Sequence, residues 1–580
     1  MNHVVIHADD LGLSRSFNAG ILEAAQRGIL TSTCLRVNGS AYVPAVREIL
    51  PAVPHLGVGL HLNIVEGRST RTAIPKSSLL CHSDGTYRLG FGGLYRGTAS
   101  QGLLQEIEAD YRDQFERALR DVAIDHVNSH QHSHGIPPLF ALVCRLAESY
   151  KVPYVRLPRE RAYVTPPRSR HWRPWFAVNL VKRTVLNHFA VENARAAAAH
   201  GRLTNDWMLG IGYTGFMDAD TVRRGLEALA GTEGVVEVLL HPTRTVAVRD
   251  EVYLDRALRD YVIQPARLSE LATLQNGALA RDIRGSGRTL THYRQLTTSP
   301  QAPVMIGIDT HEPETPPRPP LTALAILDET PFHHPEYLDR LIRECPDVQV
   351  VAAAIVELPG GGVLKKYLLK RWRQLGIREL AALSLQQIGL SLLGRLPVGL
   401  RGTFNGSVRS VAERHGRPYR IISKVNTPEF LSYVEDLGPD LIISSASPIF
   451  SERLIALPKV ACINRHSAIL PACGGILPVF RSIQQGHAFT GASVHYMVKA
   501  IDKGRVLSRK WLPIFPGDTL SRLYRLCFVL SFDATVEAIR HLRYGIAEPP
   551  LPEAEYAESY FSYPDDEDWA QFRRNGGRFI

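Results

Sequence analysis

Short apolar runs alternate with stretches of helical spacing along the chain. In the first half, HVVIHAD (His3–Asp9) is an apolar run of strand type, and SFNAGILEAAQRGI (Ser16–Ile29) places its apolar residues on one helical face. Later strand-like runs each end in polar residues: GVGLHLNI, HVNSHQH, YVRL and VVEVLLHP. Strands that alternate with helices indicate parallel α/β architecture. We therefore predict a β/α barrel or a close variant, in which the chemistry lies at the carboxyl ends of the strands.

The same alternation returns after residue 320 and predicts a second α/β domain with a Rossmann-like sheet. LTALAIL begins this series, and VQVVAAAIV, YRIIS, DLIISSA and ACINRH continue it. The intervening segment Thr297–Pro320 is rich in proline and lacks helical periodicity, which is typical of a linker. No repeat relates the two halves. The predicted organisation is a first domain at 1–298, a linker at 299–320, a second domain at 321–548 and a C-terminal tail at 549–580.

One stretch of the second half, Lys365–Leu396, is helical in pattern, basic and amphipathic. It fits a pair of packed helices inserted between strands. It equally fits a helix that lies on an anionic membrane surface. The pattern alone leaves both interpretations open.

The composition is that of a globular protein with more than one core: 580 residues, 45% hydrophobic and 21% charged. No apolar run reaches the length of about 18 residues that a membrane span needs. The seven cysteines are scattered without CxxC pairs, which predicts reduced thiols in a cytoplasmic protein. The net charge of +10 fits either a solvated surface or attraction to phosphates of a nucleotide-linked substrate, a lipid headgroup or RNA.

Three histidines occupy alternate positions in VNSHQHSH: His130, His132 and His134. In an extended conformation they would share one face of a strand. Such a run alone does not define a metal site. Further candidates lie at the ends of other strand-like runs: Asp9, Asp10, His61 and His241. Two carboxylates and several imidazoles at separate strand ends are the groups that a hydrolytic metal site needs.

The motifs ADDLG, TSTCLRVNGSA, GLHLN, SHQH and EVLLHP, in this order, resemble those of the YdjC/ChbG carbohydrate deacetylases, particularly the hopanoid-associated HpnK branch. The resemblance runs from about residue 1 to 298. It implies a divalent metal held by Asp10, His61 and His130, with Asp9 as the general base that deprotonates the attacking water. His241 would then protonate the leaving amine or steady the oxyanion. Nitrogen and oxygen ligands suit both Zn and Mg, and the sequence does not choose between them.

One departure from the family concerns Asn128, where Asp-Ser-His is usual and this chain has Asn-Ser-His. If that position orients a ligand histidine, Asn128 can still accept a hydrogen bond through its carbonyl, but without charge. We expect an effect on metal affinity rather than on the fold. His132 and His134 are expected to have at most a supporting or substrate-facing role.

In the second half, the stretch Cys462–Leu507 combines Asn464 and His466 at a strand end with Asp502 in an Asp-Lys-Gly turn. This trio suits acyl transfer to an amine. An amide donor and an imidazole can stabilise an oxyanion, and a carboxylate can set the charge of the imidazole. Each residue taken singly also fits an ordinary polar strand end of an α/β sheet.

Together, the Asn-x-His, Leu-Pro-x-x-Gly-Gly, TG-x-x-VH and Asp-Lys-Gly elements resemble the formyltransferases of methionyl-tRNA, glycinamide ribonucleotide and sugar nucleotides, from about residue 321 to 548. The resemblance implies catalysis by Asn464, His466 and Asp502, with 10-formyltetrahydrofolate as the donor. The residues expected to border the folate lie in one loop and at the sheet edge: Leu470, Pro471, Gly475, Ser445 and Pro448. PACGG stands where the family often carries a basic residue, as in PRYRG, which is expected to weaken a folate or substrate contact.

The acceptor is expected to be a small amino sugar rather than a nucleic acid. Methionyl-tRNA formyltransferases carry a further OB-type domain, whereas the 32 residues of the segment 549–580 are too few for an independent core. No basic strip interleaved with aromatic residues occurs there for RNA.

The two resemblances imply an order, because a deacetylase exposes a free amine and a formyltransferase consumes one. We predict a bifunctional enzyme that converts an acetamido sugar into a formamido sugar. Two alternatives remain: independent activities on different substrates, or a lipid- or polysaccharide-binding scaffold with one inactive domain. The carrier of the sugar and the oligomeric state are open, and the basic helices leave a peripheral membrane contact possible in principle.

Overall fold

The computed structural model describes residues 2–166, 171, 174–246, 251, 253, 255–297, 319–330, 333–357, 379, 406–545 and 554–580. The chain forms two compact units, Met1–Val246 with Glu251–Glu314 and Ala247–Asp250 with Thr315–Ile580. Most of the predicted linker, and the basic stretch Lys365–Leu396 apart from Glu379, lie outside the described residues. No described helix combines the length and the apolar character needed to cross a membrane.

The first unit is built on an eight-stranded parallel sheet in the order β5–β4–β3–β2–β1–β7–β6, with β8 also paired to β1. Tyr154 of β5 also bridges Leu203, which lies just before β6 at the other end of the order, so the sheet curls toward a barrel. The barrel-like α/β prediction is confirmed. The strands are β1 (Asn2–Leu11), β2 (Ser32–Leu35), β3 (Gly57–Leu62), β4 (His126–Ser129), β5 (Tyr154–Val155), β6 (Trp207–Leu209), β7 (Gly234–Leu240) and β8 (Thr289–Thr291).

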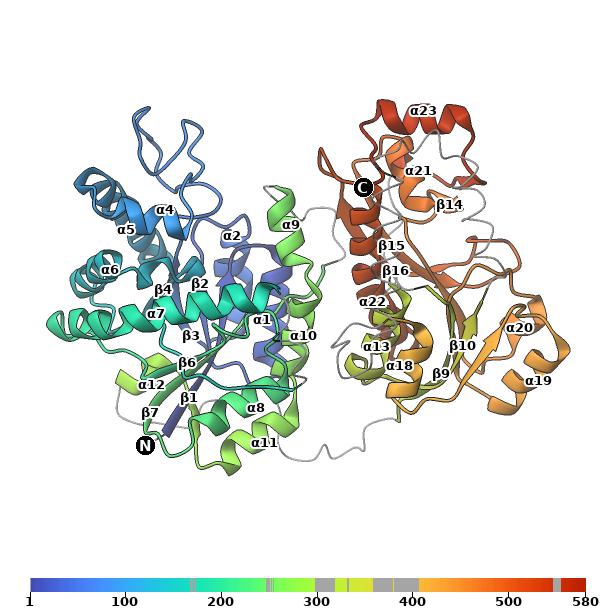
Figure 1. Ribbon diagram of the computed structural model, residues 1–580, viewed down its shortest axis with the longest axis horizontal. Helices are drawn as coiled ribbons and strands as arrows, with labels where there is room; N and C mark the ends of the chain where they lie inside the picture. Colours follow the sequence, from blue (N-terminus) through green and yellow to red (C-terminus); the bar gives the residue numbers. More distant parts are fainter. Residues whose placement is uncertain are drawn as a thin grey trace. The chain divides into compact units, whose positions relative to one another are not determined.

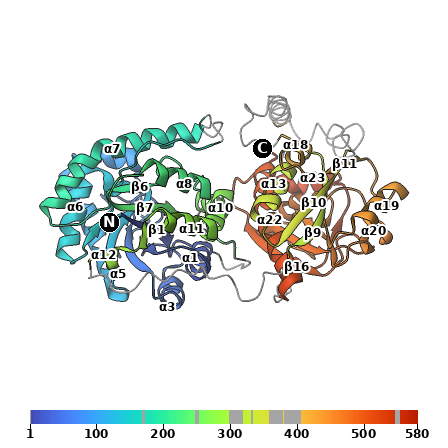
Figure 2. The ribbon, with the colours of Figure 1, turned by 90° about the horizontal axis from the view of Figure 1, so that it is seen from below.

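Helices surround this sheet on its outer side, as Figure 1 and Figure 2 show. Both faces of β1 and β3 are buried, as is usual where helices cover a parallel sheet. Ser14 caps the first helix by accepting a hydrogen bond from the amide of Phe17. The helices are α1 (Arg15–Arg27), α2 (Tyr42–Pro44), α3 (Leu50–Ala52), α4 (Phe91–Gly97), α5 (Gln101–Asp121), α6 (Pro137–Ser149), α7 (Pro174–Ala199), α8 (Ala219–Ala228), α9 (Arg256–Val262), α10 (Pro265–Leu274), α11 (Gly277–Gly285) and α12 (Tyr293–Thr297).

The histidine-rich stretch is not an extended strand. β4 ends at Ser129, and His130–Gly135 form a 3₁₀ turn. Gln131 and His132 have φ angles of 54° and 56°, in the left-handed region. The three histidines therefore do not share one face of a strand. The interpretation in which an extended strand presents all three together is wrong for this chain.

The second unit contains a seven-stranded sheet in the order β11–β10–β9–β12–β13–β15–β16. The first five strands are parallel, whereas β15 runs antiparallel to both β13 and β16. The predicted Rossmann-like architecture is confirmed. Its strands are β9 (Leu321–Asp328), β10 (Val348–Val356), β11 (Tyr419–Ile422), β12 (Leu441–Ser445), β13 (Ala461–His466), β15 (Phe489–Tyr496) and β16 (Val506–Pro513).

Alternate residues of β9 supply two cores, one on each face of this sheet. Ala325 and Leu327 belong to the core that includes residues of α13, α18 and α22, while Leu324 and Ile326 belong to the core with α19 and α20. This alternation follows from the side-chain period of a strand. The helices are α13 (His334–Glu344), α18 (Val408–Arg414), α19 (Pro428–Leu437), α20 (Glu452–Ala456), α21 (Pro478–Gln484), α22 (Leu520–Tyr544) and α23 (Asp566–Arg574).

The described part of the C-terminal segment, residues 554–580, is packed into the second unit and is not a separate tail. Its strand β17 (Tyr560–Phe561) pairs in parallel with β14 (Gly474–Gly475). Its helix α23 buries Trp569 and Phe572 beside Phe480 of α21. A segment too short for a core of its own therefore shares the core of its neighbour.

Candidate active sites

Three side chains from three strand ends of the first unit converge, as the sequence predicted. Asp10 lies at the end of β1, His61 in β3 and His130 directly after β4. Asp10 Oδ1 is 3.4 Å from His61 Nε2 and 3.3 Å from His130 Nδ1, and these two ring nitrogens are 3.4 Å apart. All three residues are buried. One carboxylate and two imidazoles within reach of one ion fit a divalent metal and leave positions open for other ligands.

The end of β1 bends so that adjacent aspartates can serve one site. Asp10 has a φ of 71°, and the pairing of β1 with β2 shifts register between Ala8 and Leu11. On a regular strand Asp9 and Asp10 would point to opposite faces. The left-handed conformation costs a residue other than glycine roughly 1–3 kcal/mol, and such strain is common at functional sites.

Asn128 orients one of the predicted ligands. Its Oδ1 accepts a hydrogen bond from His61 Nδ1 at 2.7 Å, while its Nδ2 donates to Asp9 Oδ1 at 3.2 Å. Because the amide oxygen can only accept, the proton of the neutral His61 ring lies on Nδ1 and the lone pair of Nε2 faces Asp10. Asn128 thus supports the predicted ligand His61. It does not support His130, although His130 is only two residues away in sequence.

The other two predicted ligands have partners that the sequence motifs did not reveal. Glu66 Oε2 lies 3.0 Å from His130 Nε2, and the Tyr261 hydroxyl donates to Asp10 Oδ2 at 3.0 Å. Glu66 is carried by the loop after β3 and Tyr261 by α9, so neither stands next to a ligand in sequence. Partners of this kind fix the orientation of metal-binding side chains.

Replacing Asn128 with alanine is expected to lower the affinity of the full chain for Zn²⁺ by about 10–100-fold, because His61 loses the partner that fixes its ring. Isothermal titration of the metal-free protein with Zn²⁺ measures this change. Asn128→Asp, which restores a charged acceptor, serves as the control and is expected to bind at least as tightly as the native chain. Equal affinity of the alanine variant and the native chain would contradict the assigned role.

Asp9 is buried in an ion-paired network. Arg156 donates to both of its oxygens, at 2.9 Å and 2.7 Å, and also lies 2.6 Å from Glu237 Oε1. Burial by itself raises the pKa of Asp9, but Arg156 and His61 outweigh it and hold the pKa well below its usual range. Asp9 is therefore ionised at neutral pH. Its role as general base stays a prediction.

Arg156 also decides between two possible cation sites. His7, Asp9 and Cys34 offer ligand atoms within 4.8 Å of one another, as the first trio does. In that second group, however, Arg156 already occupies both carboxylate oxygens of Asp9. The first trio is thus the better site for a metal. Arg156 directly follows β5, and this strand-end position is the one signal by which the sequence could have revealed it.

His241 directly follows β7 and lies beside Asp9, with Nε2 4.0 Å from Asp9 Oδ2. Its Nδ1 is 3.7 Å from Glu270 of α10. The side chain is 12% exposed, whereas Asp9 is almost completely buried. This position lies on the accessible side of the carboxylate, where a substrate group could approach, and the predicted acid role stays a prediction.

The remaining two histidines of VNSHQHSH differ from each other. His134 is a structural residue, because its ring nitrogens bond Ser129 Oγ at 2.6 Å and the carbonyl of Arg156 at 2.9 Å. His132 is 4% exposed, and within the described residues its Nδ1 has no hydrogen-bond partner. Burial, with Lys182 nearby, holds the pKa of His132 well below its usual range, so the ring is neutral.

The predicted trio of the second unit also comes together, with one addition. His466 Nδ1 lies 3.5 Å from Asp502 Oδ2, and His495 Nε2 lies 3.4 Å from Asp502 Oδ1 and 3.4 Å from Asn464 Nδ2. His495 of β15 thereby links Asn464 to Asp502. It belongs to the TG-x-x-VH element, but the pattern alone assigned it no role. An amide, two imidazoles and one carboxylate thus meet at the end of β13.

Asp502 is held in place by backbone as well as by side chains. It has a φ of 54°, and its Oδ2 accepts a hydrogen bond from the amide of Gly475 at 2.8 Å. Burial raises the pKa of Asp502, but His466 and His495 outweigh it and leave the pKa below its usual range. The carboxylate is therefore charged at neutral pH. It can set the protonation of the imidazole beside it.

Replacing Asp502 with asparagine is expected to lower the pKa of His466. Burial already holds that pKa below 6.5, and the negative charge of Asp502 works against the burial. Removing the charge leaves the burial effect unopposed, so protonation moves to lower pH. A titration of the histidine rings followed by NMR measures the shift, with the exposed Asp436→Asn as the control. An unchanged or raised pKa of His466 in the variant would show that Asp502 does not act on this ring.

The residues expected to border a folate lie in two separate places, the loop after β13 and the region at the end of β12. Gly475 lies in β14 against Asp502, and Pro471 follows a cis peptide bond in the same loop. Leu470 is 1% exposed, so its side chain packs inside the unit and can only shape the loop from within. Ser445 is the last residue of β12 and Pro448 lies three residues further on. The Ser445 hydroxyl accepts a hydrogen bond from the Nε of Arg465 at 2.7 Å. Folate binding by this set stays a prediction.

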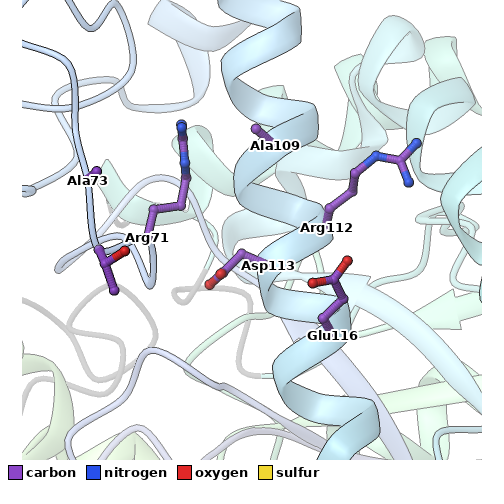
Figure 3. A pocket seen from close by; sticks show the side chains of 7 residues that line it. Arg71, Ala73, Ala109, Arg112, Asp113 and Glu116 are labelled. Carbon is purple, nitrogen blue, oxygen red and sulfur yellow. The ribbon is translucent and has the colours of Figure 1, made fainter.

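A separate hollow of about 280 Å³ lies on the first unit between the loop at Arg71 and helix α5. Figure 3 shows Asp113 pointing from α5 toward the side that carries Arg71. Arg112 and Glu116 complete its charged lining, and Arg112 is bound to Glu108 at 2.7 Å. Opposite charges balance there, and none of the predicted site residues lines it. This hollow is therefore separate from both predicted sites.

Fold and sites together define a protein of two α/β units, one with a carboxylate–histidine cluster suited to a metal and one with a polar trio suited to acyl transfer. Residues 3–285 match the family described as YdjC-like protein, and residues 404–539 match the formyl transferase family. The chain is thus similar to the YdjC-like family over its first half and to the formyl transferase family over residues 404–539. Both resemblances predicted from the motifs are confirmed.

Individual relatives agree with this division. The chain is 35% identical over 156 residues to a carbohydrate deacetylase of Brevibacillus brevis, covering 27% of this chain and 59% of the relative. It is 30% identical over 156 residues to a methionyl-tRNA formyltransferase of Thermotoga sp. (strain RQ2), covering 27% and 49%. The matches therefore span about half the length of these curated relatives.

Two solved structures are also similar. A protein of Enterococcus faecalis, provisionally assigned to cellobiose-phosphate cleavage, is 20% identical with a TM-score of 0.38, covering 51% of this chain and all of the other. A sugar N-formyltransferase of Shewanella sp. is 16% identical with a TM-score of 0.27, covering 44% of this chain and 87% of the other.

Proposed function

We propose that this chain is a bifunctional enzyme that removes the N-acetyl group of an amino-sugar conjugate and formylates the freed amine. The observation that carries the proposal is the presence in one chain of two assembled sites whose reactions share an amine. Asp10, His61 and His130 form the first site. Asn464, His466 and Asp502 form the second. The donor of the formyl group would be 10-formyltetrahydrofolate.

In the first unit, Asp10, His61 and His130 would hold a divalent cation, either Zn²⁺ or Mg²⁺. The cation would supply Lewis-acid polarisation of the amide carbonyl. Asp9, kept ionised by Arg156, would take a proton from water. His241, 4.0 Å from Asp9 and the more exposed of the two, would return a proton to the departing amine.

In the second unit, the amine would attack the formyl carbon and negative charge would develop on the formyl oxygen. The Asn464 amide can donate a hydrogen bond to this oxygen. The His466 imidazole would contribute as a donor that this oxygen shares with the carbonyl of Cys473, which accepts from His466 Nε2. Asp502 lies 3.5 Å from His466 Nδ1 and sets the charge of that ring. His495, between Asn464 and Asp502, restricts the orientation of both.

The two reactions form a sequence in which the product of the first is the acceptor of the second. Joining both sites in one chain raises the effective concentration of the amine near the second site. The net change replaces an N-acetyl group by an N-formyl group, which is one methylene lighter. Acetate is the product that leaves.

Incubation of the full chain with an N-acetylamino-sugar conjugate, Zn²⁺ or Mg²⁺ and 10-formyltetrahydrofolate is expected to yield acetate and an N-formyl product. Mass spectrometry of the sugar and enzymatic assay of acetate measure the two outcomes. Leaving out the folate should stop the reaction at the free amine. If formylation occurs only on amines unrelated to the deacetylated product, the coupled function is excluded and two independent activities remain. If neither product forms with any amino sugar tested, a binding scaffold is the better explanation.

The proposed partners are small: an amino sugar linked to a nucleotide, a lipid or a polysaccharide, with no nucleic acid. If the basic stretch from Lys365 binds anionic lipid, as basic amphipathic helices do, a lipid-linked substrate at a membrane surface would follow. We further propose a cytoplasmic location, because all seven cysteines are free and thiols persist in reducing compartments.

A further inference from the structure

One residue of the C-terminal segment, Ser559, makes three hydrogen bonds to the loop that follows His466. Its hydroxyl accepts from the amide of Cys473 at 2.9 Å, and its carbonyl accepts from the amide of Gly474 at 3.0 Å. Its own amide donates to the carbonyl of Pro471 at 3.2 Å. Three backbone groups of this loop thus have their hydrogen-bond partner in Ser559.

The contact continues on both sides of Ser559. The carbonyl of Phe561 accepts from the amide of Ile476 at 2.9 Å, which extends the pairing of β14 with β17. A Cβ at Gly475, whose φ is 92°, would lie 2.2 Å from the same carbonyl, so only glycine permits this approach. Glu558 forms an ion pair with Lys503, the residue next to Asp502. The segment thereby touches both loops that carry the second site.

The backbone groups that hold the catalytic side chains are direct neighbours of those held by Ser559. The carbonyl of Cys473 accepts from His466 Nε2 at 2.8 Å, and the amide of Gly475 donates to Asp502 at 2.8 Å. Cys473 has a φ of 57°, which a residue with a side chain adopts only when its surroundings enforce it. The hydroxyl of Ser559 bonds the amide of this same residue.

The segment is anchored firmly enough to act as a support. Phe572 of α23 is fully buried and stacks on Phe480 with ring centroids 4.4 Å apart. Asp568 forms an ion pair with Arg481 at 2.7 Å. On the other side of β17, Tyr556 is 1% exposed, and its hydroxyl accepts from the amide of Phe489 at 3.2 Å. β17 is thus fixed at both ends.

We propose that the C-terminal segment 554–580 is part of the formyl-transfer site and that Ser559 is a positioning residue, which sets the orientation of His466 through the backbone of Cys473. The inference rests on the proposed function of the second unit. Ser559 touches no reacting atom. Its effect passes through one backbone carbonyl to the imidazole and through one backbone amide to the carboxylate.

The test compares Ser559→Ala with Ser559→Thr and Ser562→Ala in the full chain. Ser562 lies in the same segment with an exposed side chain, so Ser562→Ala is the matched control. For Ser559→Ala, kcat of formyl transfer is expected to fall about tenfold while KM for 10-formyltetrahydrofolate changes by less than about twofold, since a misplaced catalytic group affects the reaction more than the binding. Ser559→Thr, which keeps the hydroxyl, is expected to restore kcat.

A second measurement does not depend on turnover. The NMR signal of the His466 Nε2 proton, which reports its hydrogen bond to Cys473, is expected to shift or to broaden in Ser559→Ala and to keep its position in Ser562→Ala. If the native chain shows no formyl transfer, the proposed function fails, and this signal still decides the role of Ser559. Native kcat with an unchanged His466 signal in Ser559→Ala would overturn the proposal, as would an equal effect of Ser562→Ala.

Discussion

Asp10→Ala is expected to lower acetate release by the full chain about 1,000-fold or more, which corresponds to about 4 kcal/mol of transition-state stabilisation. Asp10 is the one carboxylate of the cluster, and its Oδ1 lies within 3.4 Å of both histidine nitrogens. Without it, the trio keeps only its two imidazoles, and they bind a divalent cation weakly. Acetate measured at saturating substrate and Zn²⁺ gives the size of the loss. Formyl transfer to a supplied amino sugar is expected to stay at the native rate.

The reciprocal control is His466→Ala, which alters the other unit. It is expected to lower formyl transfer about 100–1,000-fold, the usual effect of removing one donor to an oxyanion. Acetate release should be unchanged. The same two assays on both variants therefore separate the two sites. If Asp10→Ala releases acetate at the native rate, the cluster is not the hydrolytic site.

Arg156→Met is expected to destabilise the first unit by about 3–5 kcal/mol, because it leaves buried charge without a partner. Arg156 is fully buried and is the shared cation of Asp9 and Glu237. Hydrogen exchange of the β1, β4 and β7 peptides in the full chain measures the loss as faster exchange. Peptides of β9 and β13 provide the internal reference. Arg145→Met, at an arginine with an exposed side chain, is the matched control, with an expected change within about 0.5 kcal/mol.

The destabilisation by Arg156→Met should depend on pH in a defined direction. In the native chain the pKa of Asp9 lies well below its usual value of 3.8, because Arg156 and His61 outweigh its burial. Its pairing therefore stabilises the fold above pH 3.8 and is lost as the pH falls through the depressed value. In the variant, burial raises the pKa values of Asp9 and Glu237. Protonation of these carboxylates therefore relieves the repulsion between them as the pH falls. The difference in the free energy of unfolding between the variant and the native chain should therefore become smaller as the pH falls. A difference that becomes larger would contradict this account.

Much of the fold followed from local pattern. The runs HVVIHAD, GVGLHLNI and VVEVLLHP form β1, β3 and β7, because a parallel sheet covered by helices selects long apolar strands. The strands β2 and β6 are only four and three residues long, and neither has a distinctive pattern. They are strands because their neighbours β1, β3 and β7 offer backbone hydrogen bonds. Such pairing is a property of the sheet and cannot be found within four residues.

The amino-acid sequence by itself determined the two α/β units, because apolar periodicity is a local signal. Strand-end residues gave the candidate polar groups, and the resemblance of the motifs to known families predicted which of them form the metal-type trio and the acyl-transfer trio. The tertiary structure decided which groups support them. Glu66 reaches His130, Tyr261 reaches Asp10 and Arg156 reaches Asp9 from distant positions in the chain. Ser559 reaches Cys473 across 86 residues of sequence. A hydrogen bond of about 3 Å depends on how separate elements pack, and no spacing of residues along the chain encodes that distance.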